Sequence, residues 1–254
     1  MAFPTSVSLS YGQEKEETSG QKQVLGTRAT LPDGRVFRYA KNGSSAITTG
    51  GFLVDAGTTN TIAAHDMDVP AVAATAGVLA ISLTVPTTAV TLNQYKDGYL
   101  IFNDGPAEGE VYRIKSNPAG DAGAAIEFTL SDGDKLRTTI TTSSLAGLVE
   151  NPYAAIKIAD GDGAAETGVL GVTTIAVTAS YYCWIQTAGI GSVAMGAQVG
   201  IVGDGLTLSQ ENAESGLAER TDYSDEADTI GIGVAIGIPS VAGDKQLCIL
   251  NIQP

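Results

Sequence analysis

Apolar and polar residues alternate with a period of two along several stretches of this chain. The longest covers residues 173–186 and contains Trp184, the only tryptophan. Its β-branched and aromatic content favours a pleated, half-buried strand over a helix. A strand of this length is unusual, so we expect a bend near residues 179–180, followed by a turn out of the sheet at Gly189 and Gly191. The Trp184 side chain should be shielded inside the domain or at a subunit contact.

Shorter alternating stretches predict further strands, spaced at intervals of roughly ten residues with turn residues between them. They cover residues 79–85, 98–103, 110–116, 126–130, 155–158, 230–238 and 246–252. A hairpin is predicted over residues 24–40, because Pro32 presets φ and Gly34 accepts a positive φ in the turn. Many short strands with regular turns are typical of a sandwich or a barrel.

Composition agrees with this pattern, since the chain has 31 glycines among 254 residues and few strong helix formers. We therefore predict an all-β protein, with a sandwich or barrel-like β body and an extended N-terminal arm. The predicted segments are 1–23 as the arm, 24–73 as a hairpin and an extended, surface-following segment, 74–160 as a β domain, and 161–254 as a C-terminal β region. The pattern leaves open whether this last region shares a core with the preceding domain.

Residues 1–23 are polar and carry little apolar periodicity. Ordering a backbone opposes folding by about 1–2 kcal/mol per residue, which so little apolar surface does not offset. We expect this arm to order along an adjacent subunit, with Phe3, Val7, Leu9 and Tyr11 as apolar anchors for the partner. Its deletion should then leave the melting temperature of the β body nearly unchanged.

The net charge of −14 argues against two classes of partner. An acidic chain without a basic stripe is repelled by nucleic acid and by anionic membranes, so we expect neither as a partner. No apolar run is long enough to span a bilayer, and the first residues lack the pattern of a secretory signal. We expect synthesis in a cytoplasm, with Cys183 and Cys248 as buried, reduced thiols.

No motif identifies an active site, a metal site or a cofactor site. His65 is the only histidine, so Ser-His-Asp or Cys-His catalysis would have to use it. No nucleophile stands near it, and we interpret it as a surface-loop histidine. The Asp-Gly pairs near Asp132 and Asp160 are interpreted as turns, not calcium loops. We predict no catalytic, cofactor-binding or metal-ligating residues and no enzymatic activity, although distant carboxylates suited to glycoside hydrolysis stay open.

Four phrases of the sequence resemble virion structural proteins of tailed bacteriophages, most of all small capsid decoration (cement) proteins. They are LGTRATLPDGRVFRYAKNG, GYLIFNDGPAEGEVYRIKSN, YYCWIQTAGIG and AGDKQLCILNI, and they are spread over most of the chain from residue 24. The resemblance implies a β-rich subunit, commonly a homotrimer, on the capsid exterior where copies of the major capsid protein meet. Terminal arms of such subunits often reach across the lattice.

A β-rich, trimeric tail protein that binds a receptor or a carbohydrate is the alternative. Exposed aromatic side chains in a groove would favour it, and the aromatic content of 6% speaks against it. A hydrolase on a β scaffold is a third class. The resemblance does not transfer attachment residues to positions of this chain.

Overall fold

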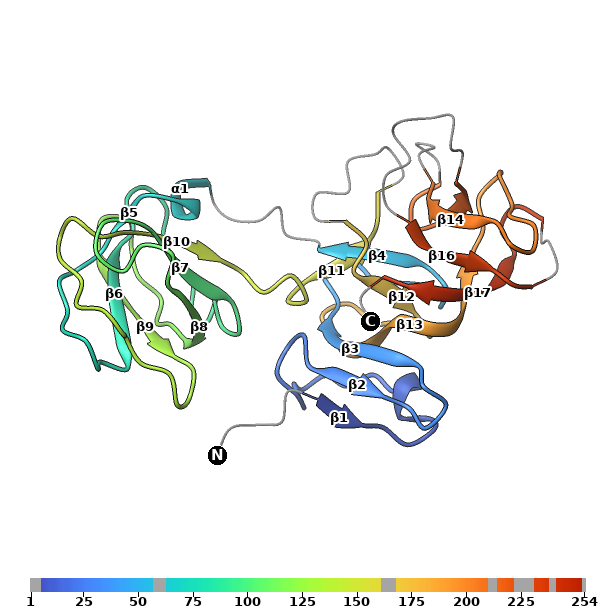
Figure 1. The fold of residues 1–254 in the computed structure, drawn as a ribbon, viewed down its shortest axis with the longest axis horizontal. Helices are drawn as coiled ribbons and strands as arrows, with labels where there is room; N and C mark the ends of the chain where they lie inside the picture. Colours follow the sequence, from blue (N-terminus) through green and yellow to red (C-terminus); the bar gives the residue numbers. More distant parts are fainter. Residues whose placement is uncertain are drawn as a thin grey trace. The chain divides into compact units, whose positions relative to one another are not determined.

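The computed structural model describes residues 6–56, 63–160, 168–209, 214–221, 231–237 and 241–252. Within these ranges the protein is all-β, with only a 3-10 turn (η1, Gln13–Lys15) and one short helix (α1, Ala63–Asp66) besides strands. No helix in the described part of the chain is long and apolar enough to cross a membrane. Contacts divide the chain into a barrel unit, Thr58–Asn151, and a large unit, Pro4–Gly57 with Pro152–Pro254 (Figure 1).

The barrel unit is a six-stranded sheet that curls back on itself. Its strand order is β5-β10-β7-β8-β9-β6, and a bridge between Ala71 and Leu83 brings the β5 end back to β6. The strands are β5 (Val69–Pro70), β6 (Ala80–Thr84), β7 (Tyr99–Asp104), β8 (Val111–Ser116), β9 (Ala125–Leu130) and β10 (Leu145–Val149). The predicted barrel-like architecture is confirmed for this unit.

Period-two alternation explains the core of the barrel unit. In β9, for example, Ile126, Phe128 and Leu130 are buried while the residues between them are not. The same holds for the inward residues of the other predicted strands, Ile81, Leu83, Leu100, Phe102, Tyr112 and Ile114. Burying one such aliphatic or aromatic side chain contributes about 1.5–3 kcal/mol, so the closed sheet is held mainly by its apolar interior.

The large unit is an eleven-stranded sheet organised around β13. Its main path is β1-β2-β3-β13-β17-β16-β14-β15, while β12 also pairs with β13, and β4 pairs with β12 and β11. The strands are β1 (Ser6–Ser8), β2 (Arg28–Thr30), β3 (Val36–Lys41), β4 (Leu53–Ala56), β11 (Ile156–Ile158), β12 (Gly171–Thr173), β13 (Tyr182–Ala194), β14 (Gly205–Leu208), β15 (Ala218–Arg220), β16 (Gly231–Ala235) and β17 (Lys245–Asn251). The predicted hairpin is β2–β3, with Gly34 at φ 88° in its turn.

The stretch 173–186 is two strands, where the sequence predicts one. β12 ends at Thr173 and β13 begins at Tyr182, and the two pair antiparallel, with Thr173 opposite Ile185. Ser180 between them has φ 63°, so the expected bend is a complete reversal of the chain. The expected turn out of the sheet at Gly189 does not occur, because β17 pairs with β13 from Ala188 to Ala194. Gly189, at φ 88°, follows a bulge inside the strand.

The surface-following segment predicted before residue 73 contains a core strand. All four residues of β4, Leu53–Ala56, are buried, and the strand pairs with β11 and β12. A strand covered on both sides lacks the alternation that identifies a half-buried strand, so the sequence pattern does not indicate β4.

Strand pairing also shifts the segment boundaries expected from the sequence. β5 pairs with β10 inside the barrel unit, whereas β11 pairs with β4 in the large unit. The β domain predicted at 74–160 therefore corresponds to the barrel unit at 58–151. The C-terminal strands share their sheet with the hairpin and β4, since β13 pairs with β3 and β12 pairs with β4.

The described part of the N-terminal arm, from Ser6 onward, lies along its own chain. β1 pairs in parallel with β2, Val7 packs against the core, and Leu9 is buried with 8% exposure. Glu17 accepts hydrogen bonds of 2.7 Å from both the backbone N–H and the hydroxyl of Thr178. The expectation that this segment orders only against a neighbour is thus corrected: intrachain hydrogen bonds and the packing of Val7 and Leu9 hold it on its own chain.

Leu9→Ala should destabilise the large unit by about 2 kcal/mol, because it removes a buried side chain beside β2. Deletion of residues 2–23 should lower the melting temperature further. Tyr11→Ala is the matched control: Tyr11 is 62% exposed, so its loss should change stability by no more than about 0.5 kcal/mol. Thermal and denaturant unfolding measure both effects, and an unchanged melting temperature after the deletion would contradict these contacts.

The predicted burial of Trp184 is confirmed at 8% exposure. Its ring lies 4.9 Å from that of Tyr39, centroid to centroid, at an angle of 60°. Trp184→Ala should reduce the free energy of unfolding by about 3–5 kcal/mol, and Trp184→Phe by less because an aromatic contact with Tyr39 remains. Denaturant unfolding gives both values. Native fluorescence that is red-shifted and readily quenched would contradict the burial.

Candidate interaction surface

The outward side of the strands β13, β17 and β16 carries exposed aliphatic side chains. Ile190, Ile249 and Val234 are direct cross-strand neighbours, exposed by 56%, 47% and 42%. Leu247 stands two residues before Ile249 on the same side of β17 and is also 47% exposed. We call these four residues the aliphatic face.

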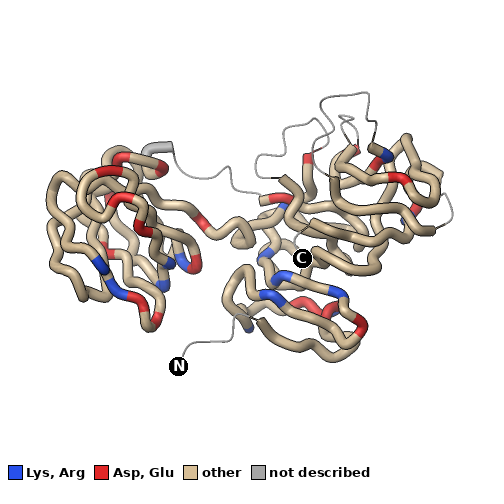
Figure 2. Tube along the Cα trace, viewed as in Figure 1, with Lys and Arg blue, Asp and Glu red and all other residues tan. Residues whose placement is uncertain are grey.

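Charge is nearly absent from these three strands. They contain no aspartate or glutamate, although the chain has 28, and Lys245 is their only charged residue, so in Figure 2 they are otherwise tan. The outward side of an antiparallel sheet is normally polar, whereas a contiguous apolar patch marks a site of interaction. The opposite sides of the strands are buried in the core, for example Cys248 and Leu250.

A groove of about 630 Å³ adjoins the aliphatic face. Ile190 and Leu247 belong to both, and the turn of the β2–β3 hairpin, with Asp33 and Arg35, lines the groove as well. Residues 49–51 and 172–174 also line it. Five separate segments of the sequence therefore build this surface.

Two of the groove's charges neutralise each other. The Arg35 Nε lies 2.8 Å from Asp33 Oδ2, and Arg35 Nη2 lies 3.7 Å from Glu14, whose side chain is buried. The pKa of Asp33 is lowered, first by its hydrogen bond from the Arg35 backbone and then by the guanidinium. Lys245, by contrast, has no ion pair with any residue that the structure describes.

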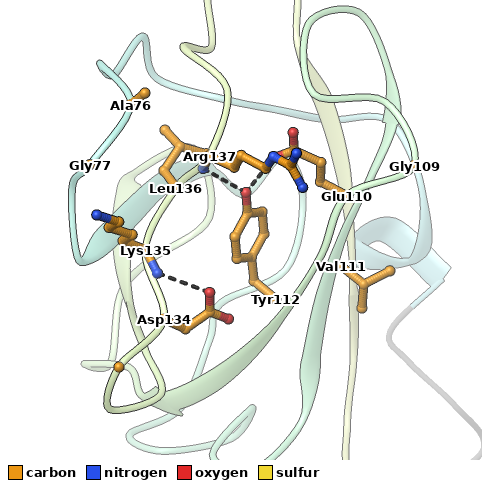
Figure 3. Close-up of a pocket in the computed structure, with 11 residues that line it drawn as sticks. Ala76, Gly77, Gly109, Glu110, Val111, Tyr112, Asp134, Lys135, Leu136 and Arg137 are labelled. Atoms are coloured by element: carbon orange, nitrogen blue, oxygen red, sulfur yellow. Dashed lines mark hydrogen bonds between the residues drawn. The ribbon is translucent and has the colours of Figure 1, made fainter.

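The barrel unit has a separate polar pocket of about 860 Å³ (Figure 3). At its base the Tyr112 hydroxyl donates a hydrogen bond to Glu110 and accepts one of 2.9 Å from the Arg137 backbone. The Thr138 hydroxyl donates to Glu110 Oε1 at 2.5 Å. These bonds tie β8 to the segment that carries Lys135 and Arg137.

The protonation states in this pocket suit a fixed network. Burial, together with the hydrogen bond to Glu110, raises the pKa of Tyr112 to about 12. Burial also raises the pKa of Glu110, but hydrogen bonds from Thr138 and Tyr112 outweigh it and bring that pKa below its usual value. At neutral pH the phenol keeps its proton and the carboxylate is ionised, so neither is poised for general acid–base catalysis.

His65 is buried in the barrel unit, with 0% exposure, and is not the surface-loop histidine expected from the sequence. Its Nε2 lies 3.0 Å from the Thr88 carbonyl oxygen, and its Nδ1 lies 2.7 Å from the Tyr95 hydroxyl. A carbonyl oxygen only accepts, so Nε2 carries a hydrogen. Both ring nitrogens are thus engaged within the unit, as a structural residue requires.

The structure does not gather the four anchors expected in the arm into one site. Phe3 lies outside the described residues, Val7 and Leu9 pack on their own chain, and Tyr11 alone is exposed. The aliphatic face was missed in the sequence, although QLCILNI is apolar on both sides of its alternation. That double pattern is the signal that could have revealed it.

The aspartates considered for calcium have other partners. Asp132 pairs with Lys115 at 2.6 Å and Asp160 with Lys157 at 2.7 Å. Within the described ranges, no three histidine, cysteine or acidic side chains gather closely enough to hold a metal ion.

Comparison with known proteins gives no relative: no family model matches the chain, and neither a curated protein nor a solved structure is significantly similar to it. Its function is therefore inferred from its own residues and geometry.

Cys183 and Cys248 are free and buried, as expected, and burial raises the pKa of each thiol to about 12. In the unfolded chain a thiol ionises near about pH 8.5. The part of the stability that depends on the neutral thiols is therefore fully present below that pH. It is lost as the pH rises toward 12, by up to about 1.4 kcal/mol per pH unit for each thiol.

Denaturant midpoints measured between neutral pH and pH 10 should show this decline, and the double variant Cys183→Ala with Cys248→Ala should flatten it. A thiol reagent should label the native protein only as fast as it unfolds. Immediate labelling at neutral pH would contradict the burial of these thiols.

Proposed function

We propose that this chain is a structural protein of a tailed-bacteriophage virion. It binds the outer surface of the capsid as a homotrimer and stabilises the shell by bridging copies of the major capsid protein, without catalysing a reaction. The observation that carries the proposal is the aliphatic face on strands that lack acidic residues. The sequence phrases that resemble decoration proteins support it independently.

The aliphatic face suits a protein partner for two physical reasons. Covering exposed aliphatic groups is favourable by about 25 cal/mol per Å² of apolar surface removed from water. In a chain of net charge −14, a surface free of carboxylates is also where a partner meets the least repulsion and the smallest desolvation cost. Charged residues elsewhere keep the subunit soluble before it attaches.

The alternative, a tail protein that binds a receptor or a carbohydrate, has less support. Sugar rings stack on open aromatic faces, but the only aromatic side chain that lines the described pocket is Tyr112, with 4% exposure. Its ring packs against Phe102 with centroids 6.3 Å apart, so it offers a hydroxyl instead of a face. The groove beside the aliphatic face has no aromatic lining residue among those described.

Ile249→Asp should weaken attachment to capsids by at least about tenfold, because it places a charge at the centre of the aliphatic face. The measurement is co-sedimentation with capsids assembled from the major capsid protein of the same phage. Leu79→Asp is the matched control: Leu79 is 64% exposed in the barrel unit, and its change should leave binding unaltered. If wild-type protein fails to co-sediment, or is found on tails instead of heads, the proposal is wrong.

A further inference from the structure

One edge of β13 faces away from β17. Backbone groups of a strand alternate between its two edges. Met195 donates its N–H to Asp244 on the β17 side at 2.9 Å, whereas Ala194 donates its N–H to Gly51 on the other side at 2.8 Å. By this alternation the backbone groups of Ile190 and Ser192 also point away from β17.

No strand in the described part of the chain pairs with this edge between Ala188 and Ala194. The pairing with β3 ends at Ala188 opposite Val36, and Gly51 occupies the far end at Ala194. The Gln186 amide donates to the carbonyl oxygens of Ala188, at 3.2 Å, and Ile190, at 2.8 Å. Among the described residues, no backbone acceptor faces the N–H groups of Ile190 and Ser192. Such a row of donors recruits an added strand.

The groove lies against this edge, since both Ile190 and Ser192 line it. Its wall is preformed by backbone hydrogen bonds. The Gly51 N–H donates to the Thr173 carbonyl oxygen at 2.6 Å, and the Gly51 carbonyl oxygen accepts from the Ala194 N–H. Glycine at position 50 lets the wall pack closely, because a Cβ there would lie 2.5 Å from the Thr174 carbonyl carbon. A preformed groove reduces the ordering cost of binding.

Charge indicates what the groove holds. The Lys245 stem lies against Gly51, where a Cβ would come within 2.9 Å of Lys245 Cε. Asp33 is already paired with Arg35, so Lys245 is the lining charge without an ion pair among the described residues. This local positive charge, on a chain of net charge −14, favours an anionic occupant.

We infer that the groove binds an extended, carboxylate-bearing peptide segment of the partner protein, added to the free edge of β13. Carbonyl groups of the segment accept hydrogen bonds from the N–H groups of Ile190 and Ser192. An aliphatic side chain covers Ile190 and Leu247, and a carboxylate pairs with Lys245. The inference rests on the proposed function in assigning the segment to the capsid protein, and it defines the chemistry that this partner must present.

The test is a titration of the full-length protein with the capped pentapeptide Thr-Val-Asp-Val-Thr, followed by amide chemical shifts and hydrogen exchange. The N–H signals of Ile190 and Ser192 should shift and gain protection from exchange. The matched peptide with Asn in place of Asp should bind about three- to fivefold more weakly, the effect of one exposed ion pair.

Lys245→Gln should produce the same loss and should abolish the difference between the two peptides. Lys135→Gln, which removes a lysine of the barrel unit, is the control and should leave binding unchanged. This cycle isolates the pairing of the carboxylate with Lys245 from any general effect of charge.

Three results would overturn the inference. The Ile190 and Ser192 amide signals could fail to shift when the peptide is added, or the Asp and Asn peptides could bind equally well. The third result is that these amides are already protected from hydrogen exchange in the free protein and lose that protection when the protein is diluted. The last result would identify a second copy as the occupant. If the peptide does not bind but the protein still co-sediments with capsids, the peptide site in the groove is rejected and the proposed function stands. If the peptide binds but the protein does not co-sediment with capsids, the proposed capsid function is rejected.

Discussion

The large unit depends on one interaction, the backbone hydrogen bonding of β13 with strands along most of both of its edges. β3 and β12 flank its first half, and β17 follows its second half. The bulge between Gln186 and Ala188 separates these halves, and the pairing with β3 ends just after it, at Ala188. A short stretch of this edge is unpaired at Ile190 and Ser192. There the Gln186 amide donates to the carbonyl oxygens of Ala188 and Ile190 but leaves the N–H groups without an acceptor from its side chain. The core, the groove and the proposed peptide site all follow from this arrangement.

Apolar residues on both sides of β17 place the core and the aliphatic face on the same strand. Cys248 and Leu250 enter the core, while Leu247 and Ile249 face outward beside Ile190. A strand of this kind stabilises the fold on one side and leaves an apolar patch on the other, which is the surface that the proposed function uses.

The barrel unit uses its polar groups differently. His65 is hydrogen-bonded to Tyr95 and Thr88, and Tyr112 is hydrogen-bonded to Glu110, so these polar groups find their partners inside the unit. Burial without partners would destabilise each of them, which gives the networks a structural reason to exist. The titratable side chains of the barrel unit, such as His65 and Tyr112, are thus part of the scaffold. The candidate site consists instead of aliphatic side chains and backbone groups.

The sequence by itself determined the half-buried strands, because alternation at Ile126, Phe128 and Leu130 reports one covered side and one wet side. It also determined the hairpin turn at Gly34 and the burial of Trp184. Only the tertiary structure decided that Leu53–Ala56 is covered on both sides, that residues 173–186 reverse direction at Ser180, and that Leu247 stays uncovered. Alternation assigns residues to two sides of a strand, but which sides are covered depends on neighbours that are distant in the sequence.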